Sequence, residues 1–254
     1  MVDPVCFHIG SRPVYWFGVL AASGFGAALW HWTVLARREG KPPEYASDVV
    51  LWLMVGGILG ARIAYVVANW EQYAHNPMAI FRIDQGGLIF YGGFLGGLLA
   101  ILGLARKRGE RALALGDFVI SGIPLGHALG RVGCFLNGCC YGEVTTCAIG
   151  HLNGGRHPAQ IYEALGDLAI FYLLAKTYDS RRFNGQTLCI YLLTYPALRF
   201  VVEFFRGDER LPFGGMTVAK WISLTMLIVG GVLWRVLGAR SVRGRDALRS
   251  DTAR

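Results

Sequence analysis

The chain has 254 residues, of which 54% are apolar and only 17% are charged, and its mean hydropathy is +0.40. A soluble domain usually carries about 25% charged residues, so this composition argues against a soluble globular protein and indicates a membrane protein. The net charge of +8 does not indicate a nucleic-acid-binding protein, because no recognition motif accompanies it and the basic residues lie at the ends of apolar runs.

Seven apolar runs approach or exceed the roughly 20 residues that a helix needs to cross a hydrocarbon core of about 30 Å. In chain order they lie near residues 14–36, 46–68, 88–105, 114–136, 158–178, 187–205 and 216–238. The sequence therefore predicts an all-α, polytopic integral membrane protein with about seven transmembrane helices. The motifs GGILGA and YGGFLGG in the second and third runs predict close helix packing, because glycine lets two backbones approach each other.

Basic residues predict the orientation of these helices. They follow the first run in ARREGK, the third in ARKRGER, the fifth in SRRF and the last in RSVRGRDALR. These loops alternate along the chain, so we expect all of them on the cytoplasmic side, with the N-terminus outside and the C-terminus inside. We expect one membrane domain over residues 1–240 with short extracytoplasmic loops, followed by a basic cytoplasmic tail at 241–254. No cleavable signal peptide is predicted, so the first run is expected to insert the protein.

Several ionisable residues lie within the predicted spans, where each costs roughly 2.5 to 3.5 kcal/mol on insertion scales. These residues are Arg62, Arg131, Arg199, Glu203 and Arg206. Arg199 and Glu203 are four residues apart and share a helix face, and Arg206 follows three residues later, which predicts an ion pair at one membrane edge. For Arg206, extension to the interface without a chemical role is an equal alternative. Because a guanidinium matches a phosphate bidentately, the buried arginines predict an anionic lipid substrate that enters from the outer side.

A second polar stretch, GGRHPAQIYEA, opens the fifth span. Pro158 suits the first helical turn, which places Gln160 and Glu163 three apart on one face with Tyr162 beside them. His157 lies just outside this helix, and two interpretations stay open for it. It is a proton carrier near neutral pH, or it caps the helix and fills an interface.

The chain has six cysteines, Cys6, Cys134, Cys139, Cys140, Cys147 and Cys189. The three in the stretch GCFLNGCC do not have the spacing of a C-x-x-C metal or redox site. Three interpretations stay open. The thiols pack as small apolar groups, Cys140 and Cys147 form a disulfide on the outer side, or three thiolates bind a metal together with His151 or His157. We expect no metal and no cofactor.

Five motifs in chain order, GARIAY, GGLIFYGGFLGG, GRVGCFLNG, HPAQIYE and RFVVEFFR, resemble those of the bacterial prolipoprotein diacylglyceryl transferases. The resemblance runs from about Ile9 to Leu237. It implies a seven-helix enzyme of the bacterial inner membrane with its active site open to the outer side. Such an enzyme transfers the diacylglyceryl group of phosphatidylglycerol to the lipobox cysteine of a prolipoprotein signal peptide and releases glycerol phosphate. Two alternatives are a paralogue with another acceptor and a non-catalytic protein that binds membrane lipids.

The resemblance also implies which residues form the site. The catalytic residues expected from the family motifs are Arg131, Arg199, Tyr91 and Glu203. The residues expected to contact substrate are Arg131, Asn137, Arg62, Arg206, His157, Gln160, Tyr162 and Glu163.

The chain departs from the family pattern at several positions. Tyr91 stands where well-known members have a histidine that is a candidate base, and a phenol is the weaker base near neutral pH. Cys134 and Cys139 stand where an asparagine and an acidic residue are common, and Phe17 stands where a first-span tyrosine is expected. Only 13 residues separate GCCYG from RHPAQ, where some members insert a much longer extracytoplasmic arm.

Overall fold

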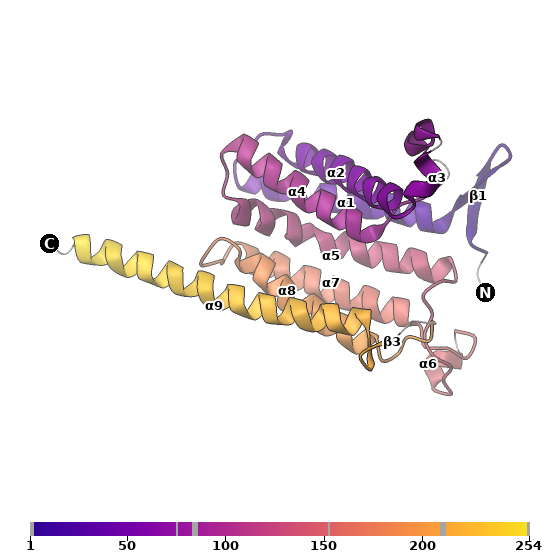
Figure 1. Cartoon of the computed structure of the whole chain (residues 1–254). Coiled ribbons are helices and arrows are strands. Elements are labelled where there is room, and N and C mark those ends of the chain that lie inside the picture. Colours follow the sequence, from indigo (N-terminus) through magenta and orange to yellow (C-terminus); the bar gives the residue numbers. More distant parts are fainter. Residues whose placement is uncertain (1–2, 75, 83–85, 152, 209–211, 253–254) are drawn as a thin grey trace. The chain divides into compact units, whose positions relative to one another are not determined.

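The computed structural model describes residues 3–74, 76–82, 86–151, 153–208 and 212–252, and 72% of the chain is helical (Figure 1). The long helices are α1 (Trp16–Arg38), α2 (Tyr45–Ala68), α4 (Phe90–Arg108), α5 (Ala112–Leu136), α7 (Ala159–Tyr178), α8 (Gln186–Val202) and α9 (Val218–Thr252). The short helices are α3 (Trp70–Ala74), η1 (Pro77–Phe81) and α6 (Ala148–His151). Strands β1 (Val5–Ile9) and β2 (Arg12–Tyr15) form one antiparallel hairpin, and β3 (Pro212–Phe213) and β4 (Met216–Thr217) form another.

A long helix occupies each of the seven predicted spans, which confirms the predicted helical class. Within the part of the chain that the structure describes, four segments are long and apolar enough to cross a membrane, namely Trp16–Arg38, Tyr45–Ala68, Ala112–Leu136 and Val218–Ser241. The prediction of a membrane protein is therefore confirmed. Helix α8 is shorter, with 17 residues, and α7 carries buried carboxylates that lower its hydropathy. Helix α9 continues past the predicted end of its span to Thr252.

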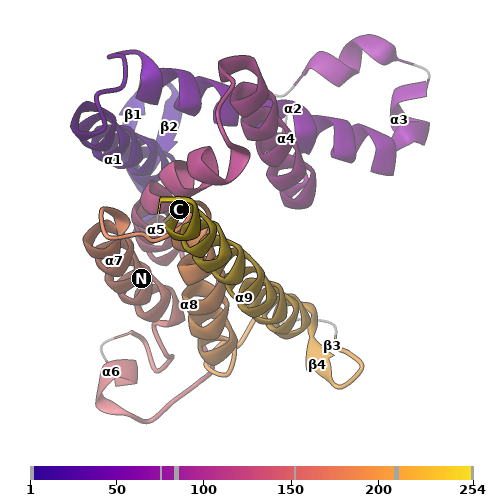
Figure 2. The same cartoon turned by 90° about the vertical axis from the view of Figure 1, so that its left-hand side faces the viewer.

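The chain divides into two compact units, residues 33–116 and residues 1–32 together with 117–254. In the first unit, α2 and α4 lie side by side (Figures 1 and 2). Their contact is made by glycines, since a Cβ atom on Gly60 would overlap the carbonyl of Gly92, and one on Gly96 would overlap the carbonyl of Gly56. The close approach predicted from GGILGA and YGGFLGG is thus confirmed.

Arg62 of α2 is buried in the same unit and binds the segment that leads into α4. Its guanidinium donates to the carbonyls of Ala79, Ile80, Arg82, Gly86 and Gly87, at 2.7 to 3.2 Å. A buried charge that is fully hydrogen-bonded is tolerated in an apolar surrounding. Arg62 therefore fixes the position of the segment that precedes the first turn of α4.

The second unit is built around α8, which packs between α7 and α9 (Figure 2). Ile170 and Leu174 of α7 form its apolar core with Tyr191 of α8. Asp117 of α5 is fully buried and accepts hydrogen bonds from the backbone N–H groups of Gly185 and Leu188, at 2.7 and 2.9 Å. Because the first N–H groups of a helix lack partners within it, this carboxylate caps α8 from another helix.

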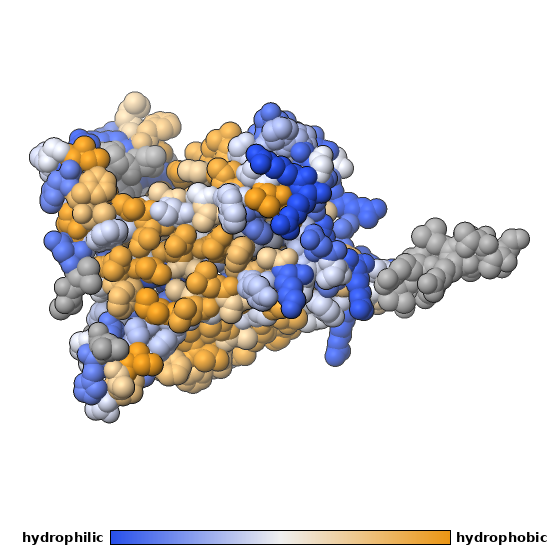
Figure 3. Space-filling view, turned by 180° about the vertical axis from the view of Figure 1, so that it is seen from behind, coloured by the Kyte–Doolittle hydropathy of each residue, from blue (hydrophilic) through white to orange (hydrophobic). Residues whose placement is uncertain are grey.

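Large apolar side chains cover much of the surface shown in Figure 3, with hydrophilic side chains gathered at its ends. Exposed apolar residues include Phe94 and Leu99 on α4, Tyr172 on α7, and Ile228 and Val232 on α9. Soluble proteins rarely expose an apolar surface of this extent. Contact with lipid acyl chains accounts for it.

The glycine contact between α2 and α4 generates a testable prediction. Gly60→Ala should lower the melting temperature of the detergent-solubilised protein, because overpacking typically costs about 1–3 kcal/mol. Gly57 lies three residues earlier on the same helix, and a Cβ atom there would lie 3.8 Å from its nearest neighbour, the carbonyl oxygen of Gly93. Gly57→Ala is the matched control and should leave the melting temperature unchanged or raise it, since alanine favours a helix. Equal losses in the two variants, measured by circular dichroism, would contradict the close contact.

Candidate functional site

The polar residues of the second unit form a seam along three helices. Each helix contributes side chains four residues apart, namely His127 and Arg131 of α5, Glu163 and Asp167 of α7, and Tyr195, Arg199 and Glu203 of α8 and its C-cap. Residues with this spacing share a helix face. The three helices therefore present their ionisable residues to one another.

Glu163 lies at the centre of the seam and its side chain is only 1% exposed. Its Oε1 atom lies 3.0 Å from Nη2 of Arg131 and 3.8 Å from Nε of Arg199. The Tyr195 hydroxyl donates to the same oxygen at 3.5 Å, and Nε2 of His127 lies 4.0 Å from it. One carboxylate oxygen thus faces two guanidinium groups, a phenol and an imidazole.

His127 and Asp167 form a second pair in the seam. They lie one helical turn farther than Arg131 and Glu163 from the loop that follows α5. Nδ1 of His127 lies 3.0 Å from Oδ2 of Asp167, whose carboxylate is fully buried. The ring of His127 also meets the ring of Tyr195 edge to face, with 5.3 Å between the centroids. A histidine oriented by a buried carboxylate in this way is a recurring arrangement for proton transfer.

The predicted pair of Arg199 and Glu203 is confirmed, with 2.6 Å between Nη1 and Oε2. Arg206 does not join it, because α8 ends at Val202 and the following chain turns away. Arg206 instead donates twice to Asp208, from Nε and Nη2, with both distances 2.8 Å.

Several polar atoms of the seam make no hydrogen bond within the described residues, and Nε of Arg131 and Oε2 of Glu163 are among them. The other side of the Arg131 guanidinium binds Glu163, and the arginine side chain is 17% exposed. Buried donors without partners are uncommon, and each costs about 1–3 kcal/mol. Arg131 therefore presents a donor that a bound anion would satisfy.

The loop after α5 is fastened over this end of the helices by backbone hydrogen bonds. The N–H of Gly142 donates to His157 at 3.0 Å, that of Glu143 to Phe205 at 2.9 Å, and that of Gly207 to Tyr141 at 3.1 Å. The loop between α5 and α7 is thereby tied to the segment after α8.

Residues at the start of α7 secure the same loop. Gln160 is buried and donates from Nε2 to the carbonyl of Cys139 at 2.6 Å, and it lies three residues before Glu163 on α7, as the shared helix face predicts. His157 lies with Nδ1 at 3.1 Å from the hydroxyl of Tyr162, and both rings contact Phe205 edge to face. This contact favours the interface interpretation of His157, although the side chain does not cap the helix.

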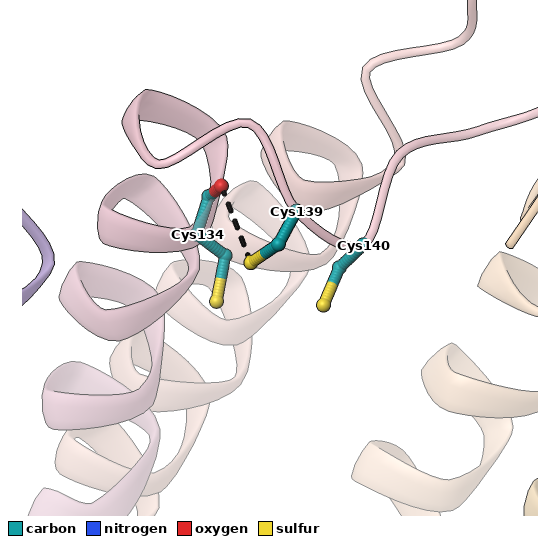
Figure 4. Close-up of side chains that lie close together, drawn as sticks. All are labelled: Cys134, Cys139 and Cys140. Atoms are coloured by element: carbon teal, nitrogen blue, oxygen red, sulfur yellow. Dashed lines mark hydrogen bonds between the residues drawn. The ribbon is translucent and has the colours of Figure 1, made fainter. Parts of the chain in front are cut away.

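The cysteines of the loop converge (Figure 4). The Sγ atoms of Cys134, Cys139 and Cys140 all lie within 4.8 Å of one another. Cys147 is exposed and not bonded to Cys140, so the alternative of a disulfide between them is wrong. The backbone of Cys140 is left-handed, with φ of 62°, and this turns its side chain toward the other two thiols. Asn137, the first residue after α5, hydrogen-bonds Cys139.

Hydrogen bonding and charge favour the ionised form of one of these thiols. The Cys134 thiol hydrogen-bonds Cys140, and Arg206 adds a second hydrogen bond and a positive charge. Together they lower the pKa of the Cys140 thiol to about 4, against the desolvation that would raise it. A thiolate at this position is stable at neutral pH.

Two of the predicted site residues belong to the other unit. Tyr91 lies in the first turn of α4 and its side chain is 61% exposed. Arg62 is occupied by the five carbonyls described above. An apolar groove in the same unit, between α2 and α4, is lined without any ionisable residue. Its chemistry suits an acyl chain, whereas the ionisable seam of the second unit suits a reaction.

Sequence reasoning missed His127, Asp167 and Tyr195. Each lies four residues from a residue that it identified, Arg131, Glu163 and Arg199 respectively, so the helical spacing carried the signal. Reading one further turn along each helix would have found all three.

Comparison with known proteins agrees with this geometry. The profile of a family described as prolipoprotein diacylglyceryl transferase matches residues 4–236. A Legionella pneumophila (strain Lens) protein named phosphatidylglycerol–prolipoprotein diacylglyceryl transferase is 32% identical over 246 residues, which cover 92% of this chain and 96% of that protein. Proteins of the same name from Idiomarina loihiensis and Pseudoalteromonas translucida are each 35% identical, over 91% of this chain and 92% and 91% of their own lengths. The chain therefore belongs to the prolipoprotein diacylglyceryl transferase family.

Proposed function

We propose that this chain transfers the diacylglyceryl group of phosphatidylglycerol to the lipobox cysteine thiol of prolipoprotein signal peptides and releases glycerol phosphate. The names of its relatives state the donor and the class of acceptor. The observation that carries the proposal is the pair of arginines, Arg131 and Arg199, held against one buried carboxylate, Glu163. This arrangement suits an anionic lipid head group in an otherwise apolar surrounding.

The arginines are proposed to bind the phosphate and stabilise it as it leaves. Each guanidinium is oriented by a carboxylate, Arg131 by Glu163 and Arg199 by Glu203. Donors that are fixed before the reaction stabilise developing charge without reorganising, and their effect is larger where water is excluded. Glu163 and Glu203 also keep the empty site from holding two uncompensated positive charges.

In the reaction, the thiolate of the lipobox cysteine attacks the glyceryl carbon that carries the phosphate. A C–S bond forms as the C–O bond breaks, and the phosphate oxygen keeps the electron pair of that bond. The thiol proton passes to a base, because the neutral thiol is the weaker nucleophile. We assign this role to Tyr91 because it stands where well-known members of the family have the histidine that is a candidate base. His127, oriented by Asp167, is the competing candidate in the seam.

The remaining predicted residues are assigned to substrate contact and to holding the loop. Asn137 and Arg206 lie beside the thiols of the loop, and Gln160 binds its backbone. His157 and Tyr162 present a polar pair at the same end of α7, where a peptide acceptor would enter. Arg62 acts indirectly, because it positions the segment that precedes α4, the helix that carries Tyr91.

Seven membrane crossings in the bacterial inner membrane are part of the same proposal, with the N-terminus outside and the site open to the outer side. A helix at each predicted span supports it, as do the basic residues that end α1 and α4. Residues 1–240 form the membrane domain and 241–254 the basic cytoplasmic tail. Helix α9 would then leave the membrane near Ser241.

The proposed reaction is tested with purified protein, phosphatidylglycerol labelled in its acyl chains and a synthetic lipobox peptide. Label should appear on the peptide, and an otherwise identical peptide with serine in place of cysteine should stay unlabelled. Phosphatidylglycerol labelled in the head group should yield labelled glycerol phosphate in equal amount. Release of glycerol phosphate without peptide labelling would indicate another acceptor, and lipid binding without turnover would indicate a non-catalytic protein.

Replacing Arg131 tests the proposed phosphate site. Arg131→Gln should lower kcat/KM by roughly 10²–10³-fold, the usual effect of removing one donor that stabilises a developing charge. Arg235→Gln, at an exposed arginine of α9, is the matched control and should keep full activity. Full activity of Arg131→Gln in the same assay would show that the seam does not bind the leaving phosphate.

Replacing Tyr91 tests the proposed base. Tyr91→Phe should lower kcat by about 10²–10⁴-fold, and Tyr91→His should restore part of the activity, because imidazole accepts a proton near neutral pH. Tyr172→Phe, at another exposed tyrosine, should leave the rate unchanged. An active Tyr91→Phe variant beside an inactive His127→Gln variant would transfer the role to the His127 and Asp167 pair.

A further inference from the structure

The three loop thiols have the geometry of a metal-binding site. Cys134 lies in the last turn of α5, and Cys139 and Cys140 lie in the loop after it. Their Sγ atoms all lie within 4.8 Å of one another, and Figure 4 shows the thiols approaching from the helix and the loop. A metal bonded tetrahedrally to three thiolates at about 2.3 Å places the sulfur atoms about 3.8 Å apart, so a movement of at most about 1 Å brings all three into bonding range.

The backbone of the loop is shaped to bring these thiols together. Side chains of consecutive residues normally point apart in extended chain, so adjacent cysteines seldom face one centre. Cys140 overcomes this by adopting φ of 62°, and it is the only non-glycine residue with positive φ in the described chain. A left-handed conformation costs a non-glycine residue roughly 1–2 kcal/mol and persists where the surroundings enforce it.

Hydrogen bonds on both sides enforce that conformation. The carbonyl of Cys139 accepts from Gln160, and the N–H of Cys139 donates to the carbonyl of Cys134 at 3.2 Å. The N–H of Gly142 donates to His157, two residues after Cys140. Hydrogen bonds before and after Cys140 therefore hold the backbone in the conformation that brings the thiols together.

The surrounding charge suits a thiolate complex of a divalent ion. Arg206 hydrogen-bonds Cys140, and Arg131 lies three residues before Cys134, one turn away on α5. Three thiolates and one divalent cation leave a single negative charge, and it lies beside these two guanidinium groups, which also pair with Glu163 and Asp208. A monovalent ion would leave two negative charges in a half-buried place. Thiolate ligands select zinc over magnesium or calcium.

We propose that Cys134, Cys139 and Cys140 form a three-thiolate site for Zn²⁺, with the fourth coordination position open. The site differs from the thiolate and histidine alternative considered from sequence, because neither His151 nor His157 belongs to the cluster. It also departs from the expectation of no metal. Binding of Zn²⁺ would lock the loop beside Arg131 and Arg206. The proposal stands on the cluster itself and does not depend on the transferase reaction.

The test uses the full-length protein in detergent, reduced and kept without oxygen, with Co²⁺ as a spectroscopic probe for Zn²⁺. Wild-type protein should bind one Co²⁺ per chain, with a thiolate-to-cobalt charge-transfer band that Zn²⁺ abolishes. Cys134→Ser, Cys139→Ser and Cys140→Ser should each weaken binding by at least about 100-fold, because even outer-shell changes cost about 10–100-fold. Native mass spectrometry supplies the stoichiometry independently of the spectrum.

Cys147→Ser is the matched control, since this cysteine lies exposed in the same loop and outside the cluster. It should bind Co²⁺ as the wild type does. Absence of the band in reduced wild-type protein would overturn the proposal. So would a band that survives in Cys139→Ser and Cys140→Ser, or one that only Cys147→Ser removes. If Cys134→Ser fails to fold, the two loop variants decide the question, and the metal readout stays separate from any transferase assay.

Discussion

The second unit depends on the ion pairs that the buried carboxylate of Glu163 forms. Charges taken out of water are stable only when they are paired, and removing one partner of a buried pair typically costs about 3–5 kcal/mol. Glu163 pairs with Arg131 and approaches Arg199, so one residue of α7 fixes the neighbouring faces of α5 and α8. The arginines proposed to bind the lipid phosphate are therefore also part of what holds the helices in register.

The antiparallel course of these helices connects the seam to the loops. His127 meets Asp167 while Arg131 meets Glu163, so the end of α5 lies beside the start of α7. The chain leaves α5 and enters α7 at the same end of the seam, where backbone hydrogen bonds tie both segments to the residues after α8. The proposed phosphate site, the loop anchoring and the thiol cluster consequently share one end of the unit.

The sequence predicts elements better than partners. Apolar length alone predicts the seven helices, and spacing alone predicts the pair of Arg199 and Glu203, because both depend on residues close together in the chain. The pairing of Arg131 with Glu163 joins residues 32 positions apart, and periodicity indicates a face without naming what it meets. The convergence of the thiols depends on the backbone at Cys140, which the cysteine spacing does not encode.

The most direct test of the central claim is an experimental structure of the protein with phosphatidylglycerol in a lipid nanodisc. The account predicts that the lipid phosphate lies within hydrogen-bond distance of Nε of Arg131, a donor without a partner among the described residues, and also contacts Arg199. Glu163 should stay paired with Arg131 in that complex. A phosphate bound elsewhere, with neither arginine in contact with it, would contradict the account.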